Sequence, residues 1–336
     1  MGRLIIHIGT HKTGTTSIQR TLDLNRKKLL NRGIRYPDYA AIGHRTHYAH
    51  LGVVNALAGE QHKISQEQAR QYFQHVASTL DEADLTLLSA ESLYRHHAKR
   101  RDDGGRDAAS YWQARSQFVE QFRELVGPAE IVIVVRRQCD FAESMYQEHV
   151  KVTRYTKSFE RFLEDFWFHF EYYDQIKIWR KHFGEVKVIK FDDIKGKAIT
   201  RRFLLRAGLK PGRFEEAGLV NVGIAPDIVL FKRWLNDSYL SKDQMKDVLQ
   251  LISEAPTERL ALPDGPRHLF AGNEHRARFQ EKFSDANRTI VQEFFGGEGE
   301  LFAPVAAGVD ETCFGDDMDP QICRLAVAAL VDRLVP

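Results

Sequence analysis

The chain has 336 residues, 43% of them hydrophobic and 28% charged, which is typical of a folded globular protein and excludes disorder as its main state. Its 48 basic and 46 acidic residues leave a net charge of +2, so we expect no nucleic acid among its partners. No apolar run approaches the roughly 18 residues of a membrane span, there is no signal-peptide pattern, and the three cysteines are too scattered for a disulfide framework. These features together predict a cytoplasmic protein.

The first two thirds of the chain alternate between strand-like and helix-like segments. Short apolar runs at 3–8, 85–89, 131–135 and 186–191 predict strands, and segments with helical periodicity separate them. The uninterrupted β-branched run at 131–135 is typical of a strand buried on both faces of a parallel sheet. The pattern predicts an α/β fold in which helices flank a parallel sheet.

Beyond residue 210 no comparable strand is evident. Helical patterns occupy 226–236, 241–253, 284–295 and 320–334, the last with a specific start signal at Asp319 and Pro320. We therefore expect an α/β core over residues 1–210. The rest, 211–336, is expected to be a mainly helical extension packed on that core and belonging to the same domain.

The first strand runs into a loop that suits an anion. The segment Gly9-Thr10-His11-Lys12-Thr13-Gly14-Thr15-Thr16 follows a strand and opens a helix, so it offers free backbone N–H groups and a positive helix end. Its two glycines have the spacing of the loop that binds nucleoside triphosphates. That loop carries lysine where this chain has Thr15, whereas the lysine here is Lys12. A magnesium-triphosphate site is accordingly less expected.

The segment HKTGTTSIQ resembles the 5′-phosphosulfate-binding loop of sulfotransferases that use 3′-phosphoadenosine-5′-phosphosulfate (PAPS). A second resemblance follows the strand at 131–135, where Arg136 and Ser144 resemble the 3′-phosphate-binding segment of the same family. The family often has Asn-Pro after the arginine, and this chain has Arg137-Gln138, so either arginine remains a candidate. A weaker resemblance continues through residues 186–209.

This resemblance implies a P-loop-NTPase-like sulfotransferase fold and the transfer of a sulfuryl group from PAPS to a hydroxyl or amine of an acceptor. The expected acceptor is a carbohydrate or a small molecule, and the expected second product is adenosine 3′,5′-bisphosphate. Lys12 would stabilise the leaving oxygen, and no metal is required. The expected cofactor-binding residues are His11, Lys12, Thr13, Gly14, Thr15, Thr16, Ser17, Arg136 and Ser144.

The reaction also needs a base, and the family uses either a glutamate or a histidine. Glu91 directly follows the predicted strand at 85–89, at the edge where parallel sheets bind ligands. The other candidate is a histidine cluster, His44, His47 and His50, which would share one face if the segment were helical. Glu91 has the alternative role of a carboxylate at a helix start, and the histidines that of surface or packing residues. A zinc site at these histidines is disfavoured because nothing nearby supplies a patterned fourth ligand.

Two other functions stay open at this point. A P-loop-type nucleotide kinase would use the same loop, although the lysine expected after Gly14 is missing. A nucleotide-binding protein without transfer activity would keep the loop and lose the chemistry. The presence of both Lys12 and Arg136 favours an enzyme.

Overall fold

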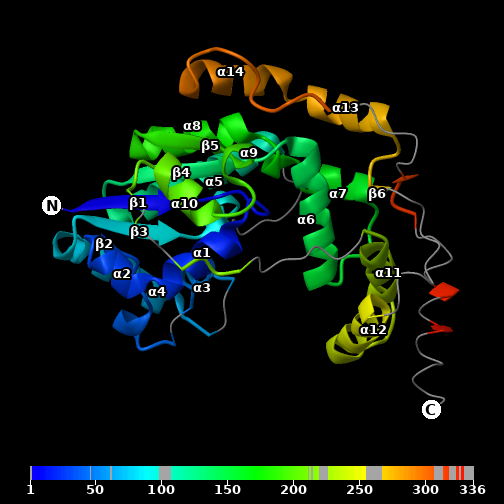
Figure 1. Cartoon of the computed structure of the whole chain (residues 1–336), viewed down its shortest axis with the longest axis horizontal. Coiled ribbons are helices and arrows are strands. Elements are labelled where there is room, and N and C mark those ends of the chain that lie inside the picture. The colour runs from blue at the N-terminus through cyan, green and yellow to red at the C-terminus, as the bar shows by residue number, and fades with distance from the viewer. Residues whose placement is uncertain are drawn as a thin grey trace. The chain divides into compact units, whose positions relative to one another are not determined.

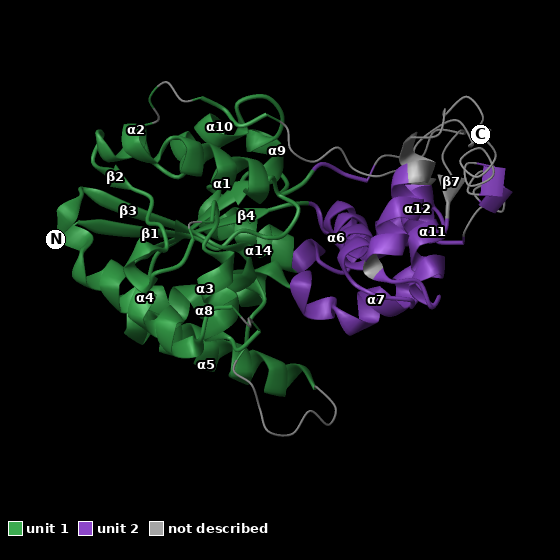
Figure 2. Ribbon diagram, turned by 90° about the horizontal axis from the view of Figure 1, so that it is seen from below, with its two compact units in different colours: residues 1–136, 171–220, 286–302 green, residues 137–170, 221–285, 303–336 purple. Residues whose placement is uncertain are grey.

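We describe the protein from a computed structural model (Figure 1). The described residues are 2–45, 47–60, 63–97, 107–210, 212, 215–218, 226–254, 267–305, 313–317, 323–324 and 327–328. The chain forms two compact units (Figure 2). The first comprises Met1–Arg136, Glu171–Val220 and Ala286–Phe302, and the second Arg137–Phe170, Asn221–Asp285 and Ala303–Pro336. The division into a core at 1–210 and an extension at 211–336 stays a prediction, because compact units do not by themselves define a domain.

The first unit is built on a five-stranded sheet with strand order β2-β3-β1-β4-β5, and every pair of neighbouring strands is parallel. The strands are β1 (Arg3–His7), β2 (Ile34–Arg35), β3 (Leu85–Ser89), β4 (Glu130–Val135) and β5 (Val186–Lys190). The four strands expected from the sequence are confirmed, as is the parallel α/β fold. The short edge strand β2 was not expected, because two residues carry no periodic signal.

The register of the sheet gathers three chain segments at one edge. His7 at the end of β1 pairs with Ser89 of β3 on one side and with Val132 of β4 on the other. All strands run the same way, so the residues that follow β1, β3 and β4 emerge at the same edge, where parallel sheets bind ligands. Those segments begin at Ile8, Ala90 and Arg136.

Helices cover both faces of the sheet (Figure 2). On one face lie α1 (Thr15–Leu24), α2 (Arg26–Leu30), α9 (Phe191–Ile194) and α10 (Ile199–Arg206), whose buried side chains share one apolar core with the strands. On the other lie α3 (Leu51–Leu57), α4 (Gln66–Ser78), α5 (Ala108–Val126) and α8 (Tyr172–Phe183). There Phe122 packs edge-on against both Phe73 and Trp179. The segment between β1 and β2 thus contains two helices, α1 and α2, with Asn25 between them.

The second unit is mainly helical. It contains α6 (Gln138–Val152), α7 (Phe159–Asp165), α11 (Pro226–Asn236), α12 (Lys242–Glu254) and α13 (Asn273–Glu281), while α14 (Ser284–Phe294) lies mostly in the first unit. Its two short strands, β6 (Arg267–His268) and β7 (Cys313–Phe314), form a parallel pair. The helices expected at 226–236, 241–253 and 284–295 are confirmed, and most of the segment 320–334 lies outside the described residues. No described helix has the length and apolar character of a bilayer-spanning segment.

Candidate functional site

The loop between β1 and α1 has an unusual backbone. Gly9 and Gly14 have positive φ angles of 43° and 75°, and Lys12 has one of 64° although it is not glycine. A side chain in this left-handed region is strained, and such strain is concentrated at functional sites. Hydrogen bonds hold the conformation in place: Thr10 donates from its backbone N–H and its Oγ1 to the carbonyl of Val134, and Thr13 Oγ1 donates to the carbonyl of Thr10 at 2.7 Å.

The N-terminus of α1 is open to an anion. Its N-cap residue, Gly14, offers no side-chain hydrogen bond, and the first turn contains no acidic residue. The four first N–H groups of a helix have no partner within the helix, and the helix dipole places positive charge there. Here those four are the N–H groups of Gly14, Thr15, Thr16 and Ser17, and the N–H of Ile18 is the first to bond within the helix, to the carbonyl of Gly14. The N–H groups of Thr15, Thr16 and Ser17 are thus the ones that could hold an anion at this end of the helix.

The structure brings Glu91 to this loop. Glu91 begins a short 3-10 helix, Glu91–Tyr94, after β3, and its Oε2 accepts a hydrogen bond from Gln19 Nε2 of α1 at 2.8 Å. A Cβ built on Gly9 would lie 3.6 Å from the Cβ of Glu91. Burial lowers the pKa of His11 to about 4, and the negative charge of Glu91 opposes that shift. A carboxylate therefore lies within electrostatic range of the loop that carries His11 and Lys12.

A buried polar network behind Glu91 was not foreseen from the sequence. Gln19 Nε2 also donates to Ser89 Oγ at 3.1 Å, and that hydroxyl is 2.9 Å from His7 Nδ1. His7 is 1% exposed, and burial lowers its pKa to about 3, so its imidazole is neutral. Its Nε2 has no hydrogen-bond partner among the described residues. The one sign of this network in the sequence is His7, a polar residue within the otherwise apolar run of the first strand.

A buried arginine of α5 donates hydrogen bonds to the backbone of the segment that carries Glu91. Arg115 of α5 is fully buried and donates to the carbonyls of His96 at 2.5 Å and Leu93 at 2.6 Å. It also donates to Gln175 Oε1 at 2.8 Å and lies over the ring of Trp179. Burial lowers the pKa of Arg115 to about 10. The guanidinium thus fixes the segment after β3 through two carbonyl groups.

The three candidate histidines do not share a helical face, because the described residues 43–45 and 47–50 form no helix. His44 Nε2 lies 3.1 Å from Gln68 Nε2, and His47 is exposed with its Nδ1 bonded to the backbone of Ala49. His50 is buried, which lowers its pKa to about 4, and its ring bonds to the backbones of Ser89 and Pro37. In the part of the chain that the structure describes, no group of three His, Cys, Asp or Glu side chains could hold a metal ion.

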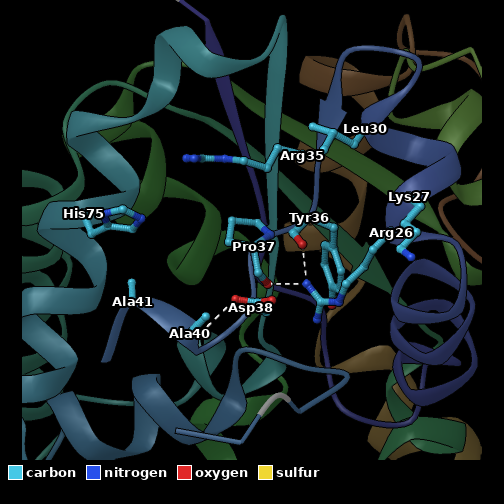
Figure 3. Close-up of a pocket in the computed structure, with 10 residues that line it drawn as sticks. All are labelled: Arg26, Lys27, Leu30, Arg35, Tyr36, Pro37, Asp38, Ala40, Ala41 and His75. Carbon is cyan, nitrogen blue, oxygen red and sulfur yellow. Dashed lines mark hydrogen bonds between the residues drawn. The ribbon is translucent and has the colours of Figure 1, made fainter. Parts of the chain in front are cut away.

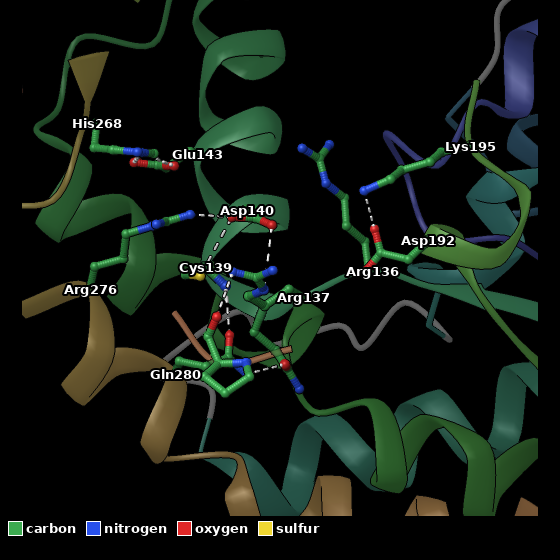
Figure 4. A network of polar contacts seen from close by, with 12 residues as sticks. Arg136, Arg137, Cys139, Asp140, Glu143, Asp192, Lys195, His268, Arg276 and Gln280 are labelled. Carbon is green, nitrogen blue, oxygen red and sulfur yellow. Dashed lines mark hydrogen bonds and ion pairs between the residues drawn. The ribbon is translucent and has the colours of Figure 1, made fainter. Parts of the chain in front are cut away.

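The two arginines after β4 have different partners. Arg136 donates from Nη1 to the carbonyl of Lys12 at 3.2 Å and lies over the ring of Phe191. Arg137 pairs with Asp140, whose carboxylate also pairs with Arg276 (Figure 4). Arg136 is therefore the arginine in contact with the loop between β1 and α1, residues 8–14, here called the Lys12 loop. Ser144 is half-buried on α6, in the second unit, and its role stays a prediction.

A separate pocket of about 310 Å³ lies beside α2, β2 and α4 (Figure 3). None of its lining residues belongs to the Lys12 loop. The guanidinium groups in it are already engaged: that of Arg26 bonds to Asp23 and to the carbonyls of Tyr36 and Pro37, and that of Arg35 to Glu82 and Thr79.

No family model and no curated protein matches the chain. Among solved structures, a sulfotransferase from Alicyclobacillus acidocaldarius is similar, with 15% sequence identity and a TM-score of 0.39 over 74% of this chain and 96% of that one. The side chains around the Lys12 loop therefore have to carry any assignment of function.

Proposed function

We propose that the protein is a sulfotransferase that moves a sulfuryl group from PAPS to a hydroxyl-bearing acceptor, a carbohydrate or a small molecule. One observation carries the proposal: the Lys12 loop, with its open helix N-terminus, lies against Glu91 at one edge of the sheet. An anion cradle beside a carboxylate suits a reaction that needs both a bound anionic donor and a base.

Each group near the loop has a proposed part. The N–H groups from Thr13 to Ser17 and the hydroxyls of Thr15 and Thr16 hold the 5′-phosphate. Arg136 binds the 3′-phosphate by charge-assisted hydrogen bonds. Lys12 stabilises the negative charge that develops on the bridging oxygen as the sulfur–oxygen bond breaks. Glu91 accepts the proton of the attacking hydroxyl. His11 contacts the donor.

Gln19 adds a positioning role that follows from its contacts. Its amide N–H groups hold one oxygen of Glu91 and the hydroxyl of Ser89. The carboxylate is thereby oriented from α1, the helix whose N-terminus would bind the donor. Donor and base are then fixed by the same helix, which keeps their separation constant.

Nucleotide binding is tested by calorimetry of the whole protein with adenosine 3′,5′-bisphosphate and with ATP. We expect clear preference for the bisphosphate. A buried charge-assisted contact contributes about 1.5–3 kcal/mol, so Arg136→Ala should weaken bisphosphate binding by roughly 10- to 100-fold. Arg137→Ala is the matched control and should change it little. Tighter binding of ATP would contradict the proposal and favour a kinase.

Transfer is tested with labelled PAPS against a panel of hydroxyl-bearing acceptors. Glu91→Gln keeps the shape of the side chain and removes its charge, so turnover should fall by about 10²–10⁴ with nucleotide binding intact. His47→Ala, at an exposed histidine, should leave turnover near that of the wild type. The reverse result would assign the base to the histidine. Bisphosphate binding without transfer to any acceptor would reduce the protein to a nucleotide-binding module.

A further inference from the structure

One face of the first unit carries a concentration of positive charge. Helices α1, α2, α9 and α10 share a core with the sheet, so their outer sides form a single outward surface, here called the basic face. Exposed cations on it include Arg20, Lys27, Lys197, Arg201 and Arg202. The protein as a whole has a net charge of only +2, so this concentration reflects placement and not composition.

The acidic side chains of this region do not neutralise it. Asp23 pairs with Arg26, Asp192 with Lys195, Asp193 with Arg206, and Glu215 with Lys28. These pairs use four further cations. The five cations named above have no carboxylate within ion-pair distance among the described residues. The basic face therefore keeps a surplus of positive charge.

The same face exposes leucines. In the described part of the first unit, the exposed large apolar side chains are Leu24, Leu30 and Leu205, which are 55%, 52% and 54% exposed. All three lie on α1, α2 or α10. Leu205 follows Arg201 and Arg202 by four and three residues, and Leu24 follows Arg20 by four, so leucine and arginine are neighbours on the helix surfaces.

We infer that the basic face docks on the surface of a bilayer that contains anionic lipids. Cations alone would suit any acidic partner, including an acidic polymer. Exposed leucines interspersed among them gain free energy only where an apolar phase is within reach, as at the boundary between lipid headgroups and acyl chains. Anionic headgroups attract the cations at the same depth. The inference goes beyond the proposed function and uses no residue of the Lys12 loop.

The test is flotation of the full-length protein with vesicles. Vesicles of phosphatidylcholine alone are compared with vesicles in which part of it is replaced by phosphatidylserine. We expect binding to the anionic vesicles only, weakening as salt is added. The triple variant Lys27→Gln, Arg201→Gln, Arg202→Gln should bind roughly 100-fold more weakly, since each cation near an anionic surface contributes about a factor of five.

A control triple variant removes the same charge from the other side of the unit: Arg70→Gln, Lys177→Gln, Lys181→Gln, at exposed cations of α4 and α8. It should bind like the wild type. The variant Leu24→Gln, Leu205→Gln keeps the charge and should bind at least 10-fold more weakly. Absence of wild-type binding, or equal loss in both triple variants, would overturn the inference. Unchanged binding of the leucine variant would also overturn it, and would favour an acidic polymer as the partner.

Discussion

Substituting Gly14 tests the geometry of the Lys12 loop most directly. Gly14 has a φ of 75°, and a Cβ there would lie 2.2 Å from Ile199 Cδ1. Ile199 is buried in the core that α1 shares with α10, so it has little room to move. The left-handed backbone disfavours alanine by about 1–2 kcal/mol, and overpacking adds about 1–3 kcal/mol. Gly14→Ala should therefore lower the free energy of unfolding by about 2–5 kcal/mol.

Two further variants separate the backbone contribution from the clash. Gly43 has a similar φ of 69°, and a Cβ there would meet nothing within 4 Å. Gly43→Ala therefore measures the backbone contribution alone, about 1–2 kcal/mol. Ile199→Val removes only Cδ1, the clashing atom, and by itself destabilises by about 0.5–1.5 kcal/mol. In the double variant Gly14→Ala, Ile199→Val, the nearest remaining atoms would be 3.6 Å away, at ordinary contact distance.

The assay is urea unfolding of the wild type and the four variants. The double variant should be more stable than the sum of its single changes predicts, by about 1–3 kcal/mol, which is the overpacking contribution recovered. Strict additivity of Gly14→Ala and Ile199→Val would refute the close approach of α10 to the loop. Equal effects of Gly14→Ala and Gly43→Ala would refute it as well.

Three other predictions follow from the site. Lys12→Gly should relieve the strain of a φ of 64° and stabilise the protein by about 0.5–1 kcal/mol, while lowering sulfuryl transfer. A loss of stability in urea unfolding would show that the backbone at this position is unstrained. Arg115→Met leaves three buried acceptors without a donor and should destabilise by about 3–5 kcal/mol; a loss below about 1 kcal/mol would contradict that role. Burial lowers the pKa values of His7 and His50 to about 3 and about 4. As pH falls below about 6.5, the unfolded chain therefore binds protons at these histidines before the folded protein does. The free energy of unfolding should fall as a result toward pH 4, by about 2 kcal/mol per histidine at pH 5. Comparing the free energy of unfolding at pH 7 and pH 5 checks this, and in His50→Gln the difference should shrink by about 2 kcal/mol.

The local features of this chain were readable from its sequence. Apolar runs predict β1, β3, β4 and β5, and their alternation with helical periodicity predicts a parallel sheet, because each run is long enough to show its period. The loop from Gly9 to Thr16 was predicted as an anion site because glycine spacing and position between strand and helix are local properties. A strand of two residues, β2, carries no such signal and was missed.

What the tertiary structure decided is which distant residues meet. Contacts between Glu91 and Gln19, or between Arg136 and the loop carbonyl of Lys12, depend on strand order and register, which no local pattern encodes. The same holds for Arg115, because its position in α5 does not predict its hydrogen bonds to the carbonyls of the segment after β3. The histidine cluster shows the converse: spacing in sequence grouped His44, His47 and His50, and a non-helical backbone gave each a different environment. Sequence fixes the chemistry available to this protein, while packing of the sheet and helices determines which groups act together, because their contacts join residues far apart in the chain.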